Sequence, residues 1–182
     1  MEDTELTDGL ITLRPLRMSD ALEVMLAVQE TMDSLRLWMP WAHPAYSIAE
    51  SEGWIKNALK SRPEGTAYEF AITDARDGAF IGGCGLNHIN TIDKVANLGY
   101  WVRSSRQRHG AASRAAKLLI KFGIDELKFN RIEILAAVEN TASRRTAEKA
   151  GAVREAIMRH RLLLPDKVHD SFLFSIIPAD IA

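Results

Sequence analysis

The sequence has little of several features that would define its class at once. It contains one cysteine in 182 residues, so no disulfide can form within the chain, which is typical of a reducing cytoplasm. It has no long apolar run, and its first residues lack the basic and apolar regions of a signal peptide, so we expect a cytoplasmic protein without a membrane span. The formal net charge is −1, which argues against nucleic acid as a partner.

Several catalytic signatures are missing as well. The histidines show no metal-ligand spacing, and there is neither a Gly-x-Ser-x-Gly elbow nor a Gly-x-x-x-x-Gly-Lys phosphate loop. Gly83-Cys84-Gly85 lacks the third glycine of a dinucleotide fingerprint. We therefore expect no metal site, and we interpret Cys84 as a core residue and its neighbouring glycines as positions of close strand packing.

The composition that remains is that of an ordinary globular protein, with 47% hydrophobic and 26% charged residues. No repeat or linker divides the chain, so we expect a single domain over residues 1–182. Ser19 is expected to cap a first helix, Ser47 and Glu50 form a capping box for a second, and Leu35–Pro44 between them is interpreted as a loop that covers a pocket. Alternating apolar residues predict strands at 11–15, 68–72, 79–86, 96–102, 131–138, 153–164 and 168–176.

The most informative stretch is Leu98–Ser113, where an apolar strand leads into a basic loop and then into an alanine-rich helix. The segment from Arg103 to Ile124 contains arginines and lysines but no acidic residue. The first turn of a helix has free backbone N–H groups and the positive end of the helix dipole, so a loop folded over that turn can hold a pyrophosphate. Gly110 would let the backbone approach such a ligand closely.

A family resemblance rests on these residues. Gln107-x-x-Gly110-x-Ala112 resembles the acetyl-CoA pyrophosphate loop of the GNAT acetyltransferases. The strand Gly99–Val102, and the motif Asn140-x-x-Ser143 before a short helix that ends at Gly151, resemble the RimJ/RimL branch of that superfamily. The resemblance implies an acetyl-CoA-dependent N-acetyltransferase with an α/β (α+β) fold, in which helices flank a mixed, mostly antiparallel sheet with a strand–loop–helix unit at its centre.

The resemblance also implies roles for individual residues. The Ser143 hydroxyl would protonate the departing CoA thiolate, a backbone N–H at Val102 would polarise the thioester carbonyl, and Asn140 would bind the pantetheine arm. Ser143 and Asn140 fit the start of an ordinary helix equally well. The residues expected to contact acetyl-CoA are Tyr100, Trp101, Val102, Arg103, Gln107, Arg108, His109, Gly110, Ala111, Ala112, Ser113, Asn140 and Ser143.

The acceptor side is less well defined. Trp38, Trp41 and Asn87 are expected to contact the acceptor, and Leu162 stands where RimL-type enzymes carry a glutamate base. His160 has the most suitable ordinary pKa among the remaining base candidates, which also include Glu133 and Glu155. A peptide α-amine, with a pKa of about 8, needs a base less than a lysine-like amine with a pKa of about 10.4.

The leading interpretation is therefore transfer of acetyl to a protein or peptide N-terminus. Two alternatives stay open: acetylation of a small amine (a polyamine, an aminoglycoside or an amino acid analogue), and CoA binding without transfer. A polyamine enzyme would need a carboxylate-lined pocket, and residues 38–44 contain no carboxylate. Relatives of this type are often dimers, so a homodimer is also considered.

Overall fold

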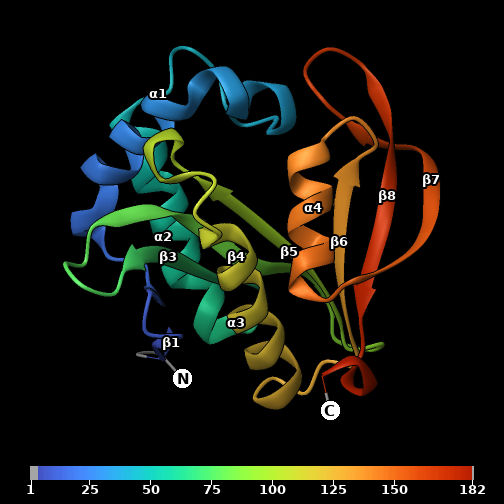
Figure 1. The fold of residues 1–182 in the computed structure, drawn as a ribbon. Helices are drawn as coiled ribbons and strands as arrows, with labels where there is room; N and C mark the ends of the chain where they lie inside the picture. The colour runs from blue at the N-terminus through green and yellow to red at the C-terminus, as the bar shows by residue number, and fades with distance from the viewer. Residues whose placement is uncertain (1–3, 182) are drawn as a thin grey trace.

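The computed structural model describes residues 4–181, which form one eight-stranded sheet in the order β1-β2-β3-β4-β5-β6-β8-β7 (Figure 1). All neighbouring strands are antiparallel except β5 and β6. The strands are β1 (Leu6–Thr7), β2 (Ile11–Pro15), β3 (Tyr68–Asp74), β4 (Phe80–Asn90), β5 (Val95–Val102), β6 (Arg131–Ala137), β7 (Val153–Leu163) and β8 (Val168–Ile176).

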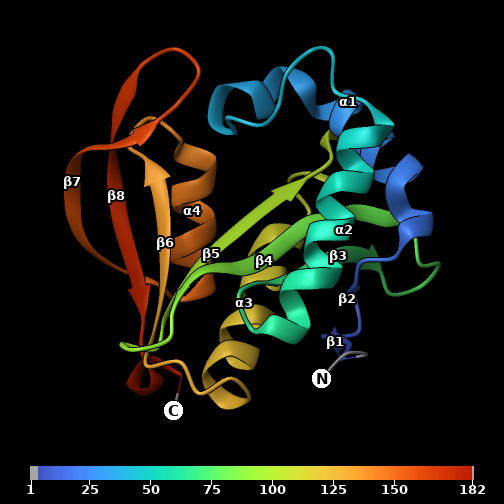
Figure 2. The same ribbon diagram turned by 180° about the vertical axis from the view of Figure 1, so that it is seen from behind.

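Helices cover both faces of the sheet. α1 (Ala21–Trp38) and α2 (Ile48–Glu64) pack on one face, and α3 (Ala111–Asp125) and α4 (Thr141–Ala150) lie on the other, as the two opposite views show (Figures 1 and 2). Each face has its own apolar core, one centred on Ile55 and Val28 and the other on Phe70 and Leu119. Among residues 4–181, no helix combines the length and apolarity that crossing a bilayer requires.

The sheet divides between its two parallel strands. β5 pairs with β6 only where Val95–Asn97 lies beside Arg131–Glu133, and beyond that point the strands diverge into the V seen in both ribbon views (Figures 1 and 2). The remaining length of β5 is therefore paired with β4 alone. Because α3 is the crossover from β5 to β6, its N-terminus lies at the open end of the V.

The expected fold class is confirmed, and the expected strands all occur with small shifts at their ends. The capping box of Ser47 and Glu50 is also confirmed, since the Glu50 carboxylate accepts from the Ser47 N–H at 2.9 Å. The glycines of β4 allow close packing as expected: a Cβ on Gly83 would lie 2.7 Å from the Trp54 ring. Cys84 is buried, as expected of a core residue, and burial raises the pKa of its thiol.

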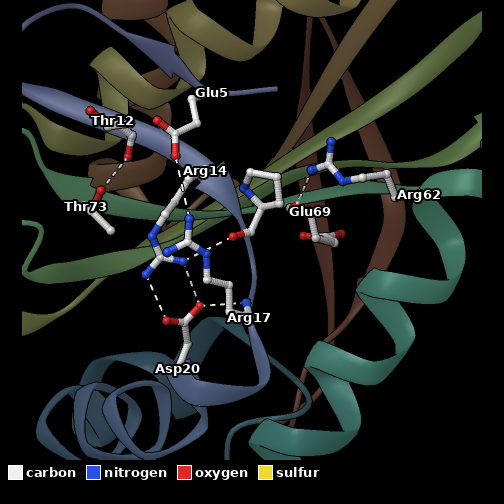
Figure 3. A network of polar contacts seen from close by, with 9 residues as sticks. Glu5, Thr12, Arg14, Arg17, Asp20, Arg62, Glu69 and Thr73 are labelled. Carbon is white, nitrogen blue, oxygen red and sulfur yellow. Dashed lines mark hydrogen bonds and ion pairs between the residues drawn. The ribbon is translucent and has the colours of Figure 1, made fainter. Parts of the chain in front are cut away.

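Two expectations for the first helix are wrong. Asp20 rather than Ser19 is the N-cap residue of α1, because a short 3-10 turn precedes the helix. The Asp20 carboxylate accepts two hydrogen bonds from Arg14 at 2.8 Å and one from the Arg17 N–H, which ties this turn to β2 (Figure 3). The helix also continues to Trp38, so the first residues of the expected loop 35–44 are helical.

Candidate functional site

The strand–loop–helix unit has the geometry that its sequence predicts. Gly110 is the N-cap residue of α3 and has a left-handed φ of 80°, a conformation that glycine adopts readily. The loop before it is held from both sides. The Gln107 side chain donates to the Val102 carbonyl at 2.9 Å, Arg106 pairs with Asp74 at 3.2 Å, and Arg103 pairs with Glu30 on α1. These contacts fix the loop over the first turn of α3.

A cleft of about 480 Å³ opens beside this turn, between α3, α4, β5 and the end of α1. Four cationic side chains line it: Arg106 and Arg108 from the loop, and Arg145 and Lys149 from α4. No carboxylate is among its lining residues, and within residues 4–181 none pairs with Arg108, Arg145 or Lys149. Three unpaired cations beside a helix N-terminus fit the phosphates of acetyl-CoA.

Most residues expected to contact acetyl-CoA line this cleft. They are Tyr100, Trp101, Val102, Gln107, Arg108, Gly110, Ala111, Ala112, Ser113, Asn140 and Ser143. Arg103 and His109 are not among the lining residues, and the guanidinium of Arg103 is held by Glu30 at 2.6 Å. Sequence reasoning missed Arg145 and Lys149; their spacing of four residues on a predicted helix was the available signal.

Ser143 is joined to β5 by a hydrogen-bonded pair of hydroxyl groups. The Tyr100 phenol donates to the Ser143 carbonyl at 3.0 Å and lies 3.1 Å from the Ser143 hydroxyl. The Asn140 side chain caps α4 by accepting from the Ser143 N–H, so the capping interpretation of Asn140 is confirmed. Burial raises the pKa of Tyr100 to about 12, so this phenol stays protonated and can supply a hydrogen bond.

The backbone of Val102 also suits the role expected of it. The N–H of the next residue, Arg103, donates to the Ile81 carbonyl at 2.8 Å. Successive N–H groups of an antiparallel strand alternate in direction, so the N–H of Val102 points away from β4, toward the side from which β6 has diverged. A strand amide in this position can donate to a carbonyl oxygen bound in the V.

A second cavity, of about 590 Å³, lies on the α1 and α2 side of β5. It adjoins the cleft, because Met39, Tyr100 and Trp101 line both. Its wall is aromatic: the ring of Trp41 lies 6.1 Å from that of Trp101 and 5.9 Å from that of Tyr46. Of the three residues expected to contact the acceptor, Trp41 and Asn87 line this cavity, whereas Trp38 lines the basic cleft.

The second cavity contains two carboxylates. Glu50 comes from α2 and Glu69 from β3, and neither was considered for this site from the sequence. Burial raises the pKa of Glu69, although Asn87 donates a hydrogen bond to its carboxylate at 3.2 Å. Residues 38–44 contain no carboxylate, but α2 and β3 supply two, so the composition of that loop does not exclude a carboxylate-lined pocket. The signal that could have identified Glu69 was a lone acidic residue inside the apolar strand Tyr68–Ile72.

The structure brings none of the expected bases to either cavity. His160 is exposed on β7, with a left-handed φ of 50°, and Leu162 is paired with His169 of β8. Glu133 and Glu155 both bind Arg131, which is why the pKa of Glu155 falls to about 2. A carboxylate held in this way is a poor proton acceptor at neutral pH.

The comparisons with known proteins agree with this geometry. Residues 11–153 match the family described as acetyltransferase (GNAT) domain. The chain is 30% identical over 139 residues to the uncharacterized N-acetyltransferase p20 of Bacillus licheniformis, covering 76% of this chain and 78% of the relative. It is 25% identical to the ribosomal-protein-serine acetyltransferase of Escherichia coli, over 74% of each chain.

The fold also matches solved structures. The ribosomal alpha-N-protein acetyltransferase RimL, solved in complex with coenzyme A, superposes with a TM-score of 0.88 at 22% identity. The match covers 96% of this chain and 98% of that chain.

Proposed function

The chain belongs to the GNAT acetyltransferase family, and from that premise we propose that it acetylates the N-terminal α-amine of a protein or peptide. Membership makes it an acetyl-CoA-dependent N-acetyltransferase. The acceptor is our inference, and it is supported by the similarity to a relative whose name is ribosomal-protein-serine acetyltransferase. The observation that carries the proposal is the meeting of a basic cleft and an acidic, aromatic cavity at Tyr100 and Trp101.

This arrangement suits direct transfer in a ternary complex. The cleft would hold the anionic cofactor, and the cavity would hold an amine that arrives as a cation, so each substrate meets the opposite charge. Both would meet at the open end of the V, where the Val102 N–H can donate to the thioester oxygen. The Ser143 hydroxyl, supported by Tyr100, would protonate the departing sulfur.

A small cationic amine is the second candidate acceptor, and a specific observation favours it. Glu50 and Glu69 supply the carboxylates that such a molecule requires, and the surrounding tryptophans can stabilise a cation through their ring faces. The two candidates differ in size and in the pKa of the reacting amine, and both differences can be tested with defined acceptors.

The test is a thiol-release assay with three acceptor sets. The first contains peptides with a free N-terminus and no lysine, the second contains the same peptides with a blocked N-terminus and one lysine, and the third contains small amines. We expect turnover with the first set, and mass spectrometry should place the acetyl group on the terminal nitrogen. Turnover with small amines alone would replace the proposed acceptor class.

A further inference from the structure

Glu69 lies on the wall of the acceptor cavity, it has no ion-pair partner among residues 4–181, and no role assigned above uses it. We propose that Glu69 is the general base of the transfer reaction, which binds the acceptor ammonium and takes a proton from it. The inference rests on the proposed function, because it names the group that activates the acceptor at that same site.

The sheet register places Glu69 in one row with two glycines that also border or approach the cavity. Glu69 of β3 is opposite Gly85 of β4, which is opposite Gly99 of β5. Directly opposed residues in neighbouring strands share a face of the sheet, so the side chain of Glu69 extends over two residues that have none. A Cβ on Gly85 would lie 2.8 Å from Oε1 of Glu69 and closer still to Oε2. The second of these glycines, Gly99, directly precedes Tyr100 in β5.

The carboxylate is oriented by a chain of amides. Asn97 of β5 donates to the Asn87 side-chain oxygen at 2.9 Å, which turns the Asn87 amide nitrogen toward Glu69. That nitrogen donates to Oε1 of Glu69 at 3.2 Å. Within residues 4–181, Oε2 receives no hydrogen bond, so one oxygen is held in position and the other is left to accept from the acceptor.

The nearest cation does not neutralise this carboxylate directly. Arg62 of α2 is buried against the Phe70 ring at 4.3 Å, and its Nη2 donates to the backbone carbonyl of Glu69 at 2.8 Å (Figure 3). The guanidinium therefore favours the ionised carboxylate through its field without occupying the carboxylate oxygens. Desolvation has the larger effect, and the pKa of Glu69 is raised. A carboxyl group adjusted in this direction is a better base near neutral pH.

The chemical step balances with these groups alone. The ionised carboxylate of Glu69 takes one proton from the acceptor ammonium, and the amine lone pair that results forms the C–N bond at the thioester carbonyl. The C–S bond breaks and its electron pair leaves with sulfur, which takes a proton from the Ser143 hydroxyl. The nitrogen then loses its second proton, and this proton restores the Ser143 hydroxyl. The products are an amide, a thiol and one proton, which Glu69 releases to solvent.

This mechanism predicts the pH profile of kcat/KM. On the acid side, kcat/KM should fall as Glu69 becomes protonated, with a midpoint above the usual range of a glutamate pKa. This midpoint should be the same for every acceptor, because the titrating group belongs to the enzyme. The titratable groups that face Glu69 or share its cavity are Arg62 and Glu50 of α2, Cys84 and His88 of β4, Tyr100 of β5, and Tyr46.

The main experiment is Glu69→Gln, measured with acceptors of low and high amine pKa. Glutamine keeps the shape and can still accept from Asn87, so the fold should persist. We expect kcat/KM near neutral pH to fall by roughly 100-fold or more. The acid limb should then move with the pKa of each amine, since only the free amine can react. Glu64→Gln, the same change at an exposed end of α2, is the matched control and should leave the profile unchanged.

A second variant keeps the carboxylate and displaces it. Gly85→Ala would put a methyl group where the carboxylate of Glu69 lies, so it should reduce kcat/KM while near- and far-ultraviolet circular dichroism show a folded protein. Gly53→Ala on α2 is its control, because a Cβ there meets nothing within 4 Å. Binding of a peptide to the CoA complex gives a readout without turnover: Glu69→Gln should weaken a free-amine peptide about tenfold and an N-acetylated peptide not at all.

The outcomes separate the two proposals. Suppose that Glu69→Gln keeps both the acid limb of the wild-type kcat/KM profile and the wild-type affinity for the peptide. That result would overturn the role of Glu69, even if peptides are good acceptors. Turnover of small amines but not of peptides would overturn the proposed acceptor, while the profile measured with those amines would still decide the role of Glu69. If the wild-type protein acetylates none of the acceptors, the binding measurement decides. Equal affinity of wild type and Glu69→Gln for a free-amine peptide would overturn the role proposed for Glu69.

Discussion

The two cavities on either side of β5 differ in charge and in origin. Among residues 4–181, the cleft proposed for the cofactor is lined by Arg106, Arg108, Arg145 and Lys149 and by no carboxylate. The cavity proposed for the acceptor is lined by Glu50 and Glu69 and, within the same residues, by no lysine or arginine. Much of the lining of the cleft comes from the end of β5, the loop after it and the first turn of α3, which follow each other in sequence. The residues that line the second cavity come from α1, α2, the loop between them, β3, β4 and β5, which are far apart in the sequence.

This difference explains which site can be recognised from sequence. A helix N-terminus binds phosphate through amides that every residue has, so the loop needs only small residues and a fixed order of elements. An acceptor cavity depends on which side chains converge, and loops that line it vary on a constant scaffold. The predictions below separate the two cavities by asking which substrate each change affects, from the largest expected effect to the smallest.

After the loss expected for Glu69→Gln, the largest effect is expected at Ser143, which lines the cleft and would protonate the departing sulfur. Ser143→Ala should lower kcat on the order of tenfold to a hundredfold and leave acetyl-CoA affinity nearly unchanged, because the hydroxyl acts when charge develops on sulfur. Tyr100→Phe removes the second hydroxyl of the pair and should have a smaller effect in the same direction. Stopped-flow and steady-state kinetics measure both. Undiminished turnover in Ser143→Ala would assign the proton to another donor.

The cofactor cleft alone is tested at Gly110. Gly110→Val should raise the calorimetric dissociation constant of acetyl-CoA at least about tenfold, or about 1.4 kcal/mol, because a side chain at the start of α3 would occupy the phosphate position. Gly78→Val is a matched control, since Gly78 has a similar left-handed φ of 74° in a turn outside both cavities. Equal losses of affinity in the two variants would attribute the effect to backbone strain rather than to the cleft.

The division between the cavities is sharpened by two tryptophans. Trp41 lines the acceptor cavity and Trp38 lines the cofactor cleft, although they are three residues apart. Trp41→Ala should raise the KM of the acceptor roughly threefold to tenfold with little change for acetyl-CoA, through lost ring contacts with a bound cation. Trp38→Ala should act on acetyl-CoA instead. If either variant raised the KM of the acceptor and the KM of acetyl-CoA by the same factor, the two cavities would not bind separate substrates.

The smallest effect is expected on stability, at a site outside both cavities. His169 of β8 is buried between Asp166 and Glu139, at 2.9 Å and 3.3 Å, and the pair with Asp166 raises the pKa of His169. Its stabilisation is fully present below the unfolded pKa of about 6.5 and is lost as pH rises through the higher folded pKa. Urea unfolding of wild type and His169→Gln across that range measures this contribution. A difference between the two proteins that does not shrink as pH rises would contradict it.

The sequence predicted the fold and the strand–loop–helix unit well for a physical reason. Strand alternation, the capping box of Ser47 and the glycine at the start of α3 are local signals, because a few neighbouring residues decide the backbone conformation. The expected cap at Ser19 was wrong because Arg14 of β2 draws the Asp20 carboxylate into a contact that local sequence does not reveal. The roles expected of Val102 and Ser143 in the reaction stay predictions.

What the sequence determined by itself was a strand–loop–helix unit on an α/β scaffold, because residues adjacent in the chain build that unit. What only the tertiary structure decided was the acceptor side. His160, Glu133 and Glu155 have the right chemistry for a base, but the sheet places the first on an exposed strand and pairs the other two with Arg131. Glu69 can extend toward β5 because strand register sets it opposite Gly85 of β4, which is itself opposite Gly99 of β5. Register is a property of the assembled sheet, since it depends on which strands pair and how they align.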